Sequence, residues 1–137
     1  MHNAAMAVYN LKQEKYREKT FLENASKWKK FVYEGKDFSV IAPTHPGDLA
    51  NEGITLHHCV KSYIQRVTDG LTNIVFIRKN IEMDKPFFTV EISNSGVIEQ
   101  VHGFGNRNAD TEEGMEDFVS EWAKHNKLKI RNFNKVR

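Results

Sequence analysis

The spacing of hydrophobic residues at the start of the chain is helical. Apolar side chains recur three and four positions apart, and this predicts a helix over residues 4–33 with Trp28 and Phe31 facing the core. Gly35 follows, and glycine is common just past a helix end. We therefore expect a first helix that ends before Gly35.

The same helical spacing returns in the second quarter of the chain. It predicts a short helix that begins around residues 44–46 and ends at Gly53, and a second helix over residues 56–69 that ends at Gly70. Thr55 is placed to cap the second helix.

Strand-like runs occupy the middle of the chain. They are short, rich in β-branched and aromatic residues, and bounded by Pro, Gly, Asn and Ser. The residues between the last two runs, 93–96, have hairpin-turn composition. The predicted strands cover residues 38–42, 73–78, 87–92 and 97–102.

A last amphipathic helix is predicted to open at Asp110, with Glu113 completing a capping box. Its apolar face is formed by Met115, Phe118, Val119 and Trp122. The elements together predict an α+β fold, in which an antiparallel sheet of three or four strands packs against helices. Residues 38–42 would add an edge to the meander, residues 1–37 would form an N-terminal helical segment, and residues 38–137 the α+β domain of one compact unit.

Composition narrows the class of protein. With 39% hydrophobic and 28% charged residues, the chain has the composition of a soluble globular domain. One cysteine cannot form an internal disulfide, and no apolar run approaches the roughly 20 residues of a membrane helix. Because no signal peptide precedes the domain, we expect a cytoplasmic protein that has no membrane partner.

Chemistry-bearing side chains concentrate around the single cysteine. Cys59 is predicted in the first turn of a helix, where the helix dipole favours a thiolate. His58 and His102 are the candidate bases, and Gln100 and Asn106 could orient the base or stabilise an oxyanion. The opposing interpretation is that Cys59 is a small buried hydrophobe, which is common for free cysteine.

Two other kinds of site were considered. The histidines and Cys59 are zinc-ligand types, but adjacent ligands on one helix diverge, so we expect no metal site and no cofactor. Nucleic-acid binding would use Arg78, Arg107 and the basic residues after Lys124, with Tyr63 stacking on bases. Against it, the net charge is only +2, and these residues could be ordinary surface charge and core aromatics.

The combination of motifs resembles the PcfJ-like family of conjugative plasmids, integrative elements and phages. The resemblance covers about residues 38–123. It rests on Asp48-Leu49, Glu52-Gly53, Leu56-His57-His58-Cys59-Val60, Tyr63, Gly70, Ile77-Arg78, Asp84-Lys85-Pro86, Thr89-Val90-Glu91-Ile92, Ile98-Glu99-Gln100, Gly103 and Asn106.

The resemblance implies an accessory protein of a mobile genetic element. We expect it to act by binding nucleic acid or a protein of the element or its host. The alternative is a hydrolase or transferase in which Cys59 is the nucleophile.

Overall fold

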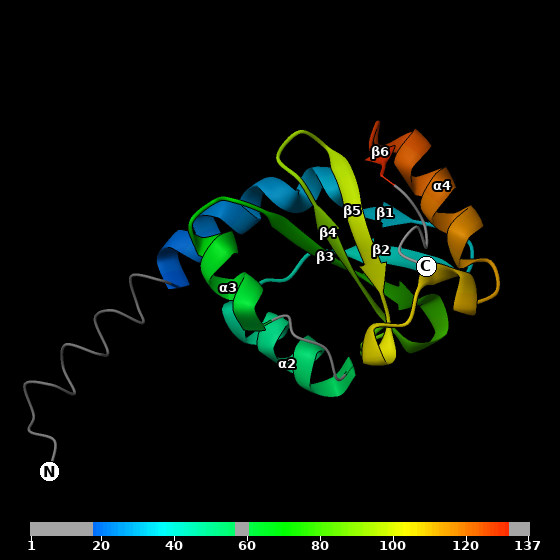
Figure 1. Cartoon of the computed structure of the whole chain (residues 1–137), viewed down its shortest axis with the longest axis horizontal. Coiled ribbons are helices and arrows are strands. Elements are labelled where there is room, and N and C mark those ends of the chain that lie inside the picture. The colour runs from blue at the N-terminus through cyan, green and yellow to red at the C-terminus, as the bar shows by residue number, and fades with distance from the viewer. Residues whose placement is uncertain (1–17, 57–60, 132–137) are drawn as a thin grey trace, which may run out of the picture.

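The structure is a computed structural model, which describes residues 18–56 and 61–131. Within these ranges the chain forms an α+β structure in which helices lie on both sides of one sheet (Figure 1). None of the described helices is long and apolar enough to cross a membrane.

The sheet is larger than the three or four strands predicted. Its six strands follow chain order: β1 (Tyr33–Glu34), β2 (Phe38–Ile41), β3 (Asn73–Lys79), β4 (Phe88–Ile92), β5 (Val97–His102) and β6 (Lys129–Ile130). Neighbouring strands are antiparallel except for β5 and β6, which are parallel. The predicted edge strand, β2, lies inside the sheet because β1 pairs with its outer side.

The N-terminal helix ends earlier than predicted. Residues 18–25 are helical and continue as the 3₁₀ helix η1 (Ser26–Phe31), after which Val32 is extended. Gly35 therefore does not cap a helix but lies between β1 and β2. A Cβ at Gly35 would approach Cε1 of Phe118 and the carbonyl oxygen of Phe38 to 2.7 Å, so the close packing there requires glycine.

The helix predicted to stop at Gly53 continues through it. Helix α2 runs over Pro46–Leu56 and α3 over Lys61–Thr68. Glycine inside a helix costs about 1 kcal/mol, and here the burial of Leu49 and Leu56 on either side offsets that cost. The short helices η2 (Asn80–Glu82), η3 (Phe104–Asn106) and η4 (Ala109–Thr111) fill connections.

The C-terminal helix α4 (Met115–His125) begins five residues later than predicted. Asp110 belongs to η4, and α4 instead opens at Gly114, whose φ of +80° favours glycine. The N-cap residue is Gly114, which has no side chain to cap the helix. The capping box predicted for Asp110 and Glu113 is therefore wrong. The predicted apolar face is confirmed: Met115, Phe118, Val119 and Trp122 are all buried.

The two faces of the sheet are covered by different helices. Phe118 of α4 packs against Phe38 on one face, while Glu52 of α2 bonds Arg78 on the other. All five residues of β4 are buried as a result. Both tryptophans hold the N-terminal segment to this core, since Trp28 Nε1 donates to Asn73 and Trp122 Nε1 donates to the Phe31 carbonyl.

Candidate functional site

Polar side chains gather on the face of the sheet that α2 and α3 cover. Thr89 pairs with His102, and Glu91 pairs with Gln100, so the four side chains project to the same side. Thr89 also pairs with Phe76, two residues before Arg78, which places Arg78 on that side as well. We name this set the polar face: Glu52, Arg78, Thr89, Glu91, Gln100 and His102.

At the centre of the polar face is a buried ion pair between α2 and β3. Arg78 Nη1 donates to Glu52 Oε2 at 3.1 Å, and Nη2 donates to Oε1. The two side chains are 8% and 1% exposed. The guanidinium also lies 5.0 Å from the centre of the Phe76 ring. Its Nε is buried without a hydrogen-bond partner among the residues described.

The charge of Glu52 depends on these neighbours. Burial raises the pKa of the Glu52 carboxyl above its ordinary value, while hydrogen bonds from Arg78 and Thr89 oppose the rise. Arg78 therefore opposes the protonation of Glu52 that burial favours. Removing the guanidinium would leave an unpaired acid in the interior.

A second carboxylate, Glu91, lies at the α3 side of the polar face. Its Oε2 accepts a 2.7 Å bond from the Thr72 hydroxyl and lies 3.4 Å from Nη1 of Arg66. Arg66 is half exposed, whereas Glu91 is nearly buried. Glu91 is therefore reached from solvent past Arg66.

His102 is the last residue of β5 and belongs to the polar face. It is partly buried, and this burial lowers the pKa of its imidazole. The ring is consequently uncharged at neutral pH and offers one nitrogen as a proton acceptor. Gln100, two residues earlier, is exposed. A partner can reach His102 and Gln100 of the polar face, and the half-exposed Arg66 beside Glu91.

Two predicted site residues lie elsewhere. Arg107 packs its guanidinium 4.7 Å from the Phe88 ring centre and donates to Thr111 and Glu112. Phe88 faces the opposite side of the sheet from Thr89, so Arg107 lies on the side away from the polar face. Its role in nucleic-acid binding stays a prediction. Asn106 is exposed in the turn after β5 with a φ of +65°. Asparagine tolerates this conformation well, which gives Asn106 a structural role.

The remaining predicted residues cannot be placed. His58 and Cys59 lie outside the described residues, and of Tyr63 only the backbone in α3 is described. The meeting of Cys59 with His102 therefore stays a prediction. The flanking helices α2 and α3 both cover the polar face, and α2 contacts the turn that contains Asn106. In the described part of the chain no group of three or more His, Cys, Asp or Glu residues is arranged to hold a metal ion.

Sequence reasoning missed Glu52, Thr89 and Glu91 as members of the site. Glu52 follows Leu49 by three residues and precedes Leu56 by four, so a carboxylate stands inside the apolar stripe of α2. A charged residue at a core position requires a partner. That signal, combined with a lone arginine in the apolar strand β3, could have identified the pair.

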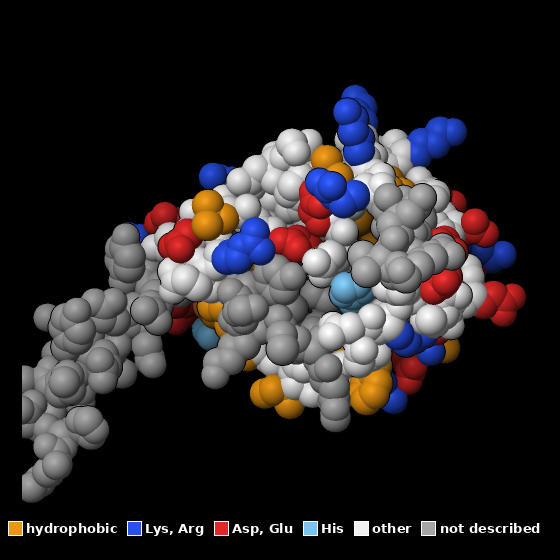
Figure 2. All heavy atoms as spheres, in the orientation of Figure 1, with side chains coloured by type: hydrophobic (Ala, Val, Ile, Leu, Met, Phe, Trp, Pro, Cys, Tyr) orange, Lys and Arg blue, Asp and Glu red, His pale blue; other side chains and the backbone are white. Residues whose placement is uncertain are grey.

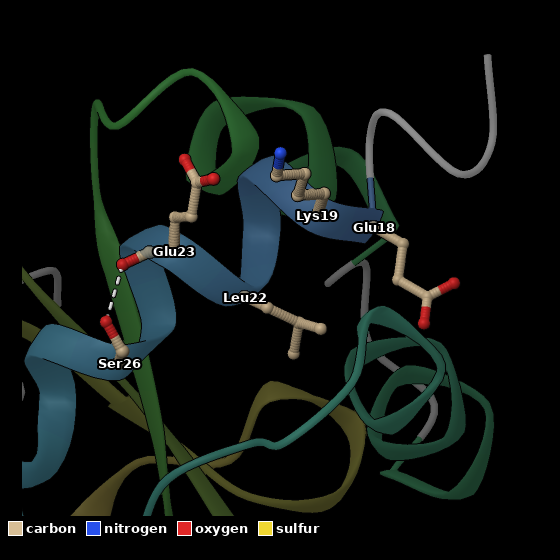
Figure 3. Close-up of a pocket in the computed structure, with 5 residues that line it drawn as sticks. All are labelled: Glu18, Lys19, Leu22, Glu23 and Ser26. Atoms are coloured by element: carbon tan, nitrogen blue, oxygen red, sulfur yellow. Dashed lines mark hydrogen bonds between the residues drawn. The ribbon is translucent and has the colours of Figure 1, made fainter. Parts of the chain in front are cut away.

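A surface hollow lies on the N-terminal helix. In Figure 3 Lys19 and Glu23 point away from Leu22, so no polar groups converge. The hydroxyl of Ser26 is already bonded to the Glu23 carbonyl at 2.7 Å. We assign no function to this hollow, which is lined by Glu18, Lys19, Leu22, Glu23 and Ser26.

Comparison with known proteins places the chain in a family. A family model described as "PcfJ-like protein" matches residues 1–119. An uncharacterized protein of Listeria innocua serovar 6a, Lin1253/Lin1744, is 29% identical over 131 residues, which cover 94% of this chain and 28% of the relative. The chain thus spans less than a third of that relative, and no solved structure matches it. This protein belongs to the PcfJ-like family.

Proposed function

We propose that the protein is an accessory factor of a mobile genetic element and acts by binding a partner at the polar face. The mobile-element setting is supported by the family to which the chain belongs. A protein partner suits the polar face better than a nucleic acid does. The site contains two carboxylates, and its one buried guanidinium is already paired with Glu52, so it would repel phosphates.

The observation that carries this proposal is the Glu52–Arg78 pair. Burying two charges costs several kcal/mol in desolvation, and apolar residues of similar volume are often as stable or more so. Stability alone is therefore a weak reason for a glutamate in the apolar stripe of α2. The pair also has a use other than stability. Glu52 accepts a hydrogen bond from Thr89, and Thr89 pairs with His102 across β4 and β5, so the ion pair helps to position both residues.

The experiment changes the reachable part of the polar face. Gln100→Ala/His102→Ala is introduced into the only copy of the gene on the element, and the frequency of transfer between cells is measured. We expect a fall of about tenfold, the effect of losing roughly 1.4 kcal/mol of binding free energy.

The control is Glu82→Gln/Lys85→Gln, which removes an exposed ion pair of 2.9 Å and should leave transfer unchanged. Normal transfer by the polar-face variant, shown to be folded by circular dichroism, would refute the proposal.

The second candidate function is a hydrolase or transferase with Cys59 as nucleophile and His102 as base. The lowered pKa of His102, caused by burial, favours it because an uncharged imidazole can accept the thiol proton. The test is the rate at which iodoacetamide alkylates Cys59 in the folded protein. We expect His102→Gln to slow that rate severalfold, and a thiol that reacts only after unfolding would exclude this function.

A further inference from the structure

Two lysine-rich segments that are far apart in the sequence meet at one end of the molecule. The side-chain amide of Asn126, just after α4, donates to the carbonyls of Lys30 at 2.9 Å and Val32 at 3.2 Å. Trp122 Nε1 reaches the Phe31 carbonyl from the same turn. These bonds hold the C-terminal end of α4 against the C-terminal end of η1.

Four exposed lysines surround this junction, and we name them the basic end: Lys29, Lys30, Lys124 and Lys127. Figure 2 shows basic side chains projecting at the top of the view, over β6 and the end of α4 that leads into it. Two nearby carboxylates already have partners, since Glu121 accepts from Tyr33 and Glu99 is bound by Arg131. Arg131 therefore offsets the charge of Glu99, whereas Glu121 is bonded to a neutral phenol and keeps its negative charge. One such carboxylate among the four lysines leaves the net charge of the basic end positive.

Lys127 provides an independent observation. Its φ is +59°, in the left-handed region that glycine or asparagine normally occupies after a helix. The amide of Leu128 closes the helix end by donating to the Ala123 carbonyl at 2.8 Å. The chain thus has a lysine where the backbone conformation favours glycine. A lysine is expected at such a position if its positive charge contributes to binding.

We propose that the basic end binds the phosphates of duplex nucleic acid. Lysines are point charges that attract phosphate without reading bases, so binding is independent of sequence. Among the described residues, the large hydrophobic side chain exposed at this junction is Val32, which is not aromatic. The rings of Tyr33 and His125 lie against each other, with centroids 4.9 Å apart. Base stacking, which single-strand binders use, is therefore not supplied here. This surface and its partner are distinct from the polar face.

The experiment measures the affinity of the full chain for a fluorescein-labelled DNA duplex by anisotropy at several salt concentrations. Four phosphate contacts give a slope of about −3.6 in log affinity against log salt, so affinity falls about 100-fold between 50 and 200 mM salt. Replacing all four lysines of the basic end by glutamine should flatten the slope by about 3.6 and weaken binding at 50 mM salt by tenfold or more.

The matched control replaces Lys19, Lys36, Lys79 and Lys85 by glutamine, which changes the net charge equally and leaves the basic end intact. This control variant should keep the wild-type slope of log affinity against log salt. Equal losses in both variants, no binding at low salt, or binding to vesicles of anionic phospholipid but not to the duplex would each overturn the proposal. Gln100→Ala/His102→Ala should bind the duplex normally, so failure here and failure of the proposed function are distinguishable.

Discussion

His102 shows how one residue can link the fold to solution behaviour. Burial holds the pKa of its imidazole below the ordinary value of 6.5. Below pH 6.5 the unfolded chain therefore binds more protons at this residue than the folded chain does. The free energy of unfolding must consequently fall as the pH drops from that value through the folded pKa.

Replacing His102 removes this contribution. We expect His102→Gln to lose less stability than the wild type between about pH 7 and about pH 5, because glutamine does not titrate. Urea unfolding at both pH values gives the loss of unfolding free energy for the variant and for the wild type. Identical losses in variant and wild type would show that His102 has the same pKa in the folded and unfolded chains.

Lys127 is a second position where a single residue is informative. Lys127→Gly should raise the free energy of unfolding by about 1 kcal/mol, because a left-handed φ strains a side chain but not glycine. Lys124→Gly, within α4, serves as the control and should lower it by about 1 kcal/mol. If both variants lose stability equally in thermal or urea unfolding, the helix does not end in this conformation.

At the scale of elements, the strands were the most predictable part of the fold. The strand at residues 97–102 is confirmed at both ends, and those at 73–78 and 87–92 are shifted by one residue at a single end. Their apolar and β-branched runs are bounded by turn residues, and Gly96 has the positive φ that the predicted hairpin needs. Local chemistry was enough because these turns are short.

Helix boundaries were less predictable because tertiary contacts decide them. Gly53 remains inside α2 because Leu49, Glu52 and Leu56 pack on the sheet. Gly35 serves the close approach of Phe118 rather than a helix end. Glycine has the same local preferences at each position, and only the packing distinguishes its roles.

The packing of helix α4 should contribute measurably to the free energy of unfolding. Trp122 is fully buried and bonded to the Phe31 carbonyl at 2.8 Å, so Trp122→Ala should cost about 3–5 kcal/mol. Ser120→Ala, on the exposed side of the same helix, should change stability by less than about 0.5 kcal/mol. An unchanged melting curve for Trp122→Ala would contradict the packing of this helix.

At the scale of the whole molecule, the candidate site was partly predictable. Arg78, Gln100 and His102 were each predicted as candidate residues, and they lie on one face of the sheet. That they share this face was not predicted. Arg107 lies on the opposite face because the turn after β5 carries it there, and a turn's direction cannot be read from composition. Glu52 was missed because its partner, Arg78, is distant in the sequence.

Strand β6 and the basic end were also beyond sequence reasoning. Two residues are too few to show a strand pattern, and β6 pairs in parallel with β5 only because α4 returns the chain to that edge. The basic end likewise needs η1 and α4 to be joined by Asn126. The polar face and the basic end are thus both products of long-range folding.

The central claim is that the Glu52–Arg78 pair is kept for function rather than for stability, and a double-mutant cycle of unfolding free energies tests it most directly. Glu52→Leu and Arg78→Met should each cost about 3–5 kcal/mol, because each leaves one buried charge unpaired. The double variant should return to within about 1 kcal/mol of the wild type. A double variant that loses the sum of the single losses would contradict the claim.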